Sequence, residues 1–155
     1  MERYYVDHAA TSPMHPDVIE VMTNVMKNTI GNPSSIHSFG REARRIIDES
    51  RTAIAKSLNA DFHEIIFTSG GTEADNLALF GTALANQNRG KHIITSQIEH
   101  HAILHTCEML EKMGFEVTYL PVNNQGFVSV QDVKEALRDD TILVSIMFAN
   151  NEVGT

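Results

Sequence analysis

The chain has 155 residues, of which 12 are Lys or Arg and 20 are Asp or Glu, so its formal charge at pH 7 is −8. With 42% hydrophobic and 21% charged residues it is typical of a globular protein, and its acidic balance disfavours a nucleic-acid groove, which needs clustered basic side chains. No apolar run approaches the ~18 residues of a membrane-spanning helix, no secretory signal is expected, and the single cysteine, Cys107, fits a cytoplasmic protein.

The first part of the chain predicts two strands and two helices. We expect a short strand at residues 4–6 and a helix from Pro16, because proline is favoured in a first helical turn and apolar residues follow at helical spacing. A break rich in Gly, Asn and Pro at residues 30–35 precedes a long helix over residues 39–58. Residues 64–68 (EIIFT) contain three consecutive apolar residues, without the alternation of a surface strand, and predict a buried central strand.

The second part of the chain alternates helices with short apolar strands. We expect helices over residues 72–84, 102–113 and from Ser129, with strands over residues 92–95, 115–120 and 141–148. This alternation predicts an α/β fold, a three-layer sandwich with a largely parallel central sheet.

The end of the chain suggests an incomplete domain. Residues 141–148 are followed only by residues 149–155, whereas a doubly wound sheet normally covers its last strand with a helix. We therefore expect residues 1–155 to be an N-terminal segment plus an incomplete large domain, the C-terminal remainder being absent. A complete domain of flavodoxin size is the alternative.

Ligands of open α/β sheets bind beyond the carboxyl ends of the strands, which points to the loops at residues 68–72, 96–101 and 149–155. In the first loop, Gly70 and Gly71 allow close approach of a ligand, and the helix start that follows offers free N–H groups to a phosphate. No Lys follows the glycines and the three-glycine pattern is absent, so a small phosphorylated ligand is favoured over a nucleotide. An ordinary capped strand–helix turn is the alternative.

Three histidines, His100, His101 and His105, lie in or shortly after the second of these loops, residues 96–101. His101 and His105 are four residues apart and share a helix face, but zinc needs further ligands and Cys107 lies on a different face, so we expect no metal site. Either one histidine, such as His100, faces the cleft as an aromatic partner or proton carrier, or all three are surface or capping residues.

Five ordered segments together resemble the cysteine desulfurases, the class V branch of the fold type I enzymes that use pyridoxal 5′-phosphate (PLP). They are residues 6–13 (VDHAATSP), 31–37 (GNPSSIH), 66–76 (IFTSGGTEADN), 99–100 (EH) and 150–154 (NNEVG). The resemblance covers the whole chain and implies PLP as cofactor. It also implies that Gly71 and Thr72 hold the phosphate, that His100 stacks on the pyridine ring and helps to move protons, and that Asn151 hydrogen-bonds near the phenolic oxygen and the substrate carboxylate.

The resemblance further implies an activity and partners. Such enzymes convert L-cysteine to L-alanine and pass the sulfur, as a persulfide on an enzyme cysteine, to an acceptor protein for iron–sulfur cluster assembly or tRNA thiolation. They are homodimers. A selenocysteine lyase or an aminotransferase of the same class is the alternative within enzymes.

The chain departs from the family in what it lacks. Family members place the Schiff-base lysine and the persulfide cysteine after the segment that corresponds to residues 150–152. No lysine of this chain lies in the corresponding motif, and Cys107 is interpreted as a packed thiol. We therefore expect the 155-residue chain alone to be inactive, and a fragment that binds partners or nothing is a further alternative.

Overall fold

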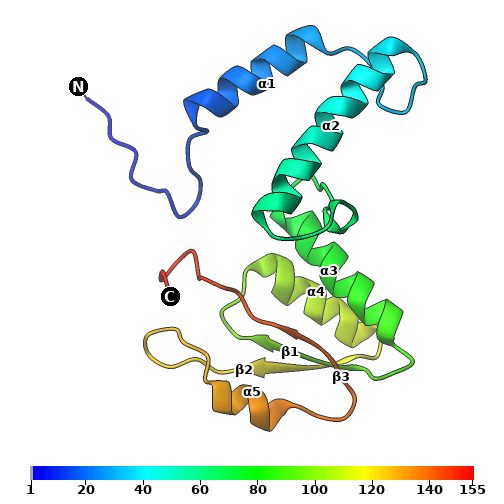
Figure 1. Cartoon of the computed structure of the whole chain (residues 1–155). Helices are drawn as coiled ribbons and strands as arrows, with labels where there is room; N and C mark the ends of the chain where they lie inside the picture. The colour runs from blue at the N-terminus through cyan, green and yellow to red at the C-terminus, as the bar shows by residue number, and fades with distance from the viewer. Residues whose placement is uncertain (1) are drawn as a thin grey trace. The chain divides into compact units, whose positions relative to one another are not determined.

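The computed structural model describes residues 2–155, and the chain divides into two compact units that meet in sequence between Phe67 and Thr68. The helices and strands of both units are labelled in Figure 1. No helix within residues 2–155 combines the length and the apolar character that crossing a membrane requires.

The first unit contains two α-helices and one short 3₁₀ turn. α1 spans Pro16–Asn28, α2 spans Ser38–Ser57, and the 3₁₀ turn η1 spans Phe62–Glu64. Histidine side chains cap both α-helices, since His15 accepts from the Asp17 amide and His37 from the Gly40 amide. Both predicted helices are confirmed within about two residues.

Two predicted strands of this unit are wrong. Residues 4–6 have no regular structure; of residues 64–68, Glu64 ends η1 and residues 65–68 are irregular, with Ile66 67% exposed. A strand needs a hydrogen-bonded partner, and no strand in the described part of the chain pairs with either segment. Instead, Arg51 of α2 donates to the Ile65 carbonyl, and its guanidinium lies 4.8 Å from the centre of the Phe67 ring.

The second unit is built on a three-stranded parallel sheet. β1 spans His92–Ser96, β2 spans Glu116–Leu120 and β3 spans Thr141–Ser145, in the order β2-β1-β3. All five residues of the central strand β1 are buried, as expected of a strand covered on both faces. β3 ends three residues before the predicted end at residue 148, because no ladder partner continues beyond Ser145.

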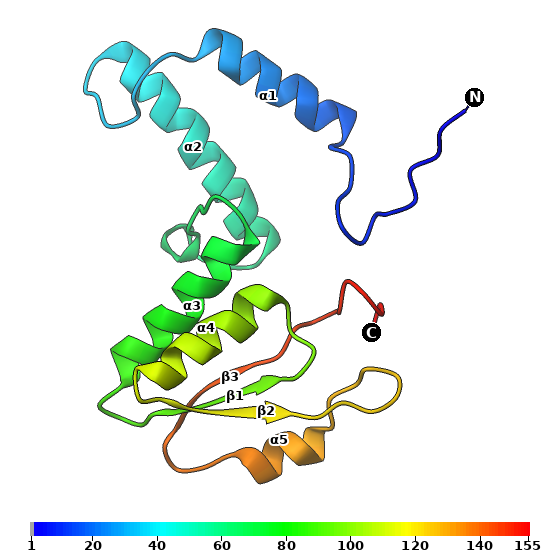
Figure 2. The same cartoon turned by 180° about the vertical axis from the view of Figure 1, so that it is seen from behind.

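Helices cover both faces of this sheet. α3 (Gly71–Asn86) and α4 (His101–Lys112) lie together on one face, and the short α5 (Val130–Ala136) lies on the other. Figures 1 and 2 show this arrangement from opposite sides. The core between α3, α4 and the sheet consists of buried apolar residues: Leu79, Ala83, Ile93, Ile103, Cys107, Leu110 and Phe115. The predicted α/β sandwich with a parallel sheet is thus confirmed.

This topology decides where the three predicted ligand loops lie. Residues 97–100 follow β1 and residues 146–155 follow β3, so two of the loops stand at the carboxyl ends of neighbouring strands. Residues 68–70 precede α3 but follow no strand in this structure, so the prediction that the first loop ends a strand is wrong. Its chemistry therefore depends on the start of α3 alone.

Candidate functional site

The start of α3 exposes unpaired donors. Its N-cap, Gly70, has no side chain that accepts from the helix, and the first intrahelical bond runs from the Ala74 amide to the Gly70 carbonyl at 3.1 Å. The amides of Gly71 and Thr72 precede that bond, so they have no intrahelical acceptor. Together with the positive end of the helix dipole, they suit an anion.

Glu73 occupies the neighbouring donors. Its carboxylate oxygen Oε2 accepts from both the backbone amide and the hydroxyl of Ser69, at 2.6 Å each. These two hydrogen bonds hold the pKa of Glu73 below its usual value. Glu73 therefore holds the residue before the N-cap, whereas the capping Ser or Thr of the alternative interpretation is absent, since the N-cap is Gly70. The amides of Gly71 and Thr72 remain available to a ligand.

The space above this turn is open. A Cβ atom placed on Gly70 or on Gly71 meets no heavy atom within 4 Å, so the protein's own side chains do not fill the turn. Two amides, the Thr72 hydroxyl and an open approach are what a phosphate group requires. The residues present thus fit the phosphate of PLP.

His100 is the N-cap of α4. Its Nδ1 accepts from the Ala102 amide at 3.1 Å, which orients the ring and, in the neutral imidazole, leaves the proton on Nε2. His100 and Thr72 line one pocket of about 320 Å³. The other residues that line it are Asn76, Phe80, His101, Ala102, His105, Thr106 and Met109. The structure therefore brings together two of the residues that the sequence singled out.

Two residues to which the sequence assigned no role, Asn76 and Thr106, connect α3 with α4 in the wall of this pocket. Asn76 donates from Nδ2 to the Thr72 carbonyl at 2.7 Å, and the Thr106 hydroxyl donates to Asn76 Oδ1 at 2.8 Å. This chain of hydrogen bonds ties the start of α3 to the helix that His100 caps. The resembling segment 66–76 contains Asn76, and the i, i+4 spacing places it one turn after Thr72, but neither signal could name Thr106 as the partner.

Asn150 and Asn151 have different surroundings. The Asn150 side chain is buried, donates to the Ile98 carbonyl at 2.8 Å, and accepts from the amides of Glu152 and Val153. Asn151 is exposed and is not among the residues that line the pocket of Thr72 and His100. The predicted contact of Asn151 with a cofactor stays a prediction.

His101 and His105 lie on one face of α4, as predicted. Their rings stack with centroids 5.3 Å apart and an interplanar angle of 27°, and both rings line the pocket of His100. Among residues 2–155, no group of three or more His, Cys, Asp or Glu side chains is arranged to hold a metal ion.

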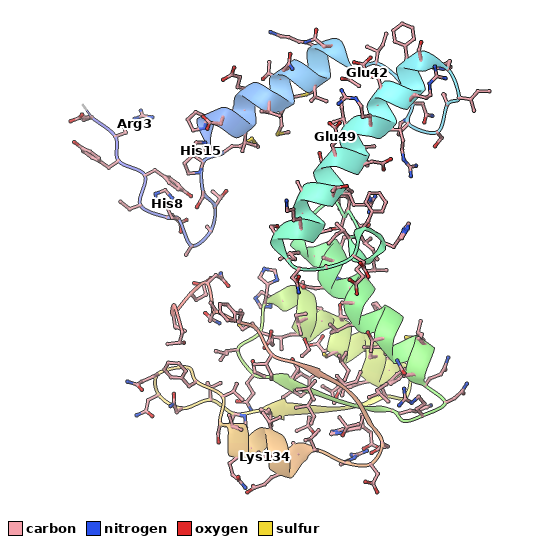
Figure 3. The ribbon with its side chains drawn as sticks, in the orientation of Figure 1. Arg3, His8, His15, Glu42, Glu49 and Lys134 are labelled. Atoms are coloured by element: carbon pink, nitrogen blue, oxygen red, sulfur yellow. The ribbon has the colours of Figure 1, made fainter. Side chains whose placement is uncertain are left out.

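Cys107 is a packed thiol, as predicted. Its side chain is 0% exposed in the core under α4, and burial raises the pKa of the Cys107 thiol to about 11, so it carries no thiolate at neutral pH. All five lysines are exposed, and none lines the pocket of Thr72 and His100. Figure 3 marks one of them, Lys134, on α5, which covers the face of the sheet opposite α3 and α4.

Comparisons with known proteins agree with this geometry. The sequence pattern of the Aminotransferase class-V family matches residues 4–155. The chain is 64% identical to the "Putative cysteine desulfurase IscS 1" of Bacillus subtilis, over 100% of this chain and 41% of that protein.

Two solved structures extend the comparison to the fold. A protein described as "NifS-like" superposes with a TM-score of 0.91 and 41% identity, over 95% of this chain and 40% of that one. A structure described as "SspA in complex with cysteine" superposes with a TM-score of 0.87 and 41% identity, over 93% of this chain and 42% of that one. The chain thus spans about two fifths of the length of these relatives.

Proposed function

The chain belongs to the aminotransferase class-V family, and from this premise we propose that it is the N-terminal part of a PLP-dependent cysteine desulfurase. In this proposal residues 1–155 supply an N-terminal segment and an incomplete PLP-binding large domain. The whole enzyme removes sulfur from L-cysteine, leaves L-alanine, and collects the sulfur as a persulfide on one of its own cysteines. The bound cofactor supplies an electron sink, which the protein orients and tunes.

One observation carries the proposal most directly. Thr72, at the open start of α3, lines the same pocket as His100, so a helix start suited to an anion and an aromatic side chain that can carry a proton share one pocket. Fixing a cofactor by its phosphate leaves the other end of its ring free to react. Neither feature alone distinguishes a PLP site from an ordinary capped helix.

Each residue then has a defined task. Gly71 and Thr72 bind the phosphate through their amides and the Thr72 hydroxyl. His100, whose Nδ1 is engaged by the Ala102 amide, contacts the pyridine ring and carries protons at Nε2. Asn151, which is exposed, hydrogen-bonds near the phenolic oxygen of the ring and the substrate carboxylate.

The proposed substrate is L-cysteine, which the description of one superposed relative names as its bound molecule. The remaining partners follow from the family: a second copy of the enzyme in a homodimer, and an acceptor protein that takes the sulfur for iron–sulfur clusters or tRNA thiolation. We place the enzyme in the cytoplasm, with no direct contact to membrane or nucleic acid, in agreement with its charge of −8.

The test uses the intact protein loaded with PLP and supplied with L-cysteine and a thiol reductant. We expect alanine and sulfide in equal amounts, and His100→Gln lowers their rate of formation without abolishing PLP binding. Selenide release from selenocysteine without activity on cysteine contradicts the proposed substrate, as does amino transfer to a keto acid. Failure to bind PLP contradicts the proposed cofactor.

A second test concerns the 155-residue chain alone. Treatment with PLP and borohydride is expected to label no lysine selectively, because all five lysines are exposed and none lines the pocket. Selective labelling of one lysine, located by peptide mapping, contradicts the expectation that the chain lacks a catalytic lysine.

A further inference from the structure

We propose that Glu99 and Asn150 form a reciprocal clasp between the loops after β1 and β3, and that this clasp positions His100 and Asn151. The hydrogen bonds of the clasp are present in the structure, whereas its purpose rests on the proposed PLP function. Glu99 and Asn150 are positioning residues in this proposal, since each acts through the residue that follows it in the chain.

Glu99 forms one half of the clasp. Its side chain is buried, with the residue only 7% exposed, and its Oε1 accepts from the Ser96 hydroxyl at 2.7 Å and from the Met147 amide at 2.8 Å. The first bond closes the loop after β1 onto its own strand. The second crosses to the loop after β3, 48 residues further along the chain.

Asn150 forms the other half in the opposite direction. Its residue is likewise 7% exposed, and its Nδ2 donates across to the Ile98 carbonyl at 2.8 Å. Its Oδ1 accepts from the amides of Glu152 and Val153 within its own loop, at 2.8 and 3.0 Å. Each loop therefore sends one buried side chain to the backbone of the other.

A buried polar side chain is costly unless hydrogen bonds compensate for the loss of water, and Oε1 of Glu99 accepts two of them. Glu99 directly precedes His100, the N-cap of α4. Its hydrogen bonds therefore fix the backbone directly beside the His100 ring.

The consequence is geometric. β1 and β3 are hydrogen-bonded neighbours, so the two loops leave the sheet side by side. In each loop the clasp residue directly precedes the proposed functional residue: Glu99 precedes His100, and Asn150 precedes Asn151. A shift of one loop against the other would displace His100 relative to Asn151, and small misplacements of this kind reduce catalysis strongly.

The first experiment tests the clasp in the intact, PLP-free protein by amide hydrogen exchange with single-residue resolution. Glu99→Ala is expected to speed exchange at the Met147 amide about tenfold or more, because that amide loses its side-chain acceptor. Glu99→Gln is expected to restore protection, because both donors meet the single oxygen Oε1, which the amide side chain keeps. Glu108→Ala, which removes an exposed glutamate of α4, is the matched control with no change.

Asn150→Asp tests the other half of the clasp and remains usable if Glu99→Ala does not fold. The replacement keeps an oxygen for the amides of Glu152 and Val153 but removes the donor to the Ile98 carbonyl. We expect faster exchange over residues 97–101. Exchange equal to that of the Glu108→Ala control, in both Glu99→Ala and Asn150→Asp, overturns the clasp.

The second experiment tests the purpose of the clasp. In the same variants we expect the imidazole NMR signals of His100 to shift without PLP, and with PLP we expect a changed visible spectrum and a fall in kcat of tenfold or more, which Glu99→Gln restores. Faster exchange with unchanged His100 signals and kcat overturns the positioning role. Exchange effects as expected in a protein that binds no PLP uphold the clasp and contradict the proposed function instead.

Discussion

Two helices of the molecule, α1 and α4, show that the same apolar spacing can lead to different burial. Both have apolar residues three and four positions apart, as the sequence indicated. α4 buries five residues, whereas α1 buries none, and its Val21 and Met26 are 62% and 69% exposed. The periodicity therefore predicts that a helix forms, but burial requires an element packed against its face.

A similar contrast in burial separates two apolar segments, each of which was predicted from the sequence to form a strand. Residues 92–96 lie between two hydrogen-bonded neighbours and are fully buried. Residues 65–67 have no ladder partner among residues 2–155 and remain irregular. A strand is thus defined by its partners as much as by its own residues.

The largest expected difference between these segments is in amide hydrogen exchange of the 155-residue chain. Exchange at Ile93 and Ile94 is expected to be at least ~1,000-fold slower than at Ile66 and Phe67, because only the first pair lies in a central strand. Measurement by NMR or mass spectrometry decides this. Equal protection at all four residues contradicts the difference in strand pairing.

Truncation of side chains tests the comparison energetically. Ile93→Ala is expected to lower the free energy of unfolding by about 2–5 kcal/mol, because Ile93 is 0% exposed in the core. Val21→Ala in α1 is the matched control and is expected to change it by less than about 0.5 kcal/mol. Both values come from urea denaturation, and similar losses in the two variants mean that the apolar face of α1 is covered in solution.

The sequence predicted most of the second unit because its local signals and its tertiary contacts agree. The boundaries of α4 and β2 were correct within one residue, since Gly114, with φ of +88°, ends the helix and the strand finds its place beside β1. The strands predicted at residues 4–6 and 64–68 failed because a local pattern contains no information about a missing partner.

The candidate site was predictable in part for the same reason. Thr72 and His100 stood out because each lies at a helix start after a loop, and the structure places both in one pocket wall. Thr106 was not found, and Glu99 appeared only as part of the segment 99–100 with no role, because the contacts of both depend on partners 30 and 48 residues away. The functional roles proposed for Thr72 and His100 themselves remain predictions.

A smaller effect is expected from Cys107, which lies in the buried face of α4. Burial raises the pKa of this thiol to about 11, above its value in the unfolded chain, so the folded state keeps a proton that the unfolded state loses. The contribution of the protonated Cys107 thiol to the free energy of unfolding is therefore fully present below pH ~8.5. It is lost as the pH rises toward 11, at up to about 1.4 kcal/mol per pH unit.

Cys107→Ala is the control for this effect. Urea denaturation between pH 8 and 11 is expected to give a steeper loss of stability in the wild type than in the variant. Parallel losses in the two proteins contradict a protonated, buried thiol. The same burial predicts that thiol reagents modify Cys107 only when the core opens.

The most direct test of the central claim compares two ligands that differ only in the phosphate, PLP and pyridoxal, on the intact protein and its Thr72→Ala variant. We predict that the variant binds PLP about 5- to 150-fold more weakly, the equivalent of ~1–3 kcal/mol for a hydrogen bond to a charged group, and binds pyridoxal as the wild type does. Equal affinity of both proteins for PLP, or an equal loss for both ligands, contradicts a phosphate site at Gly71 and Thr72.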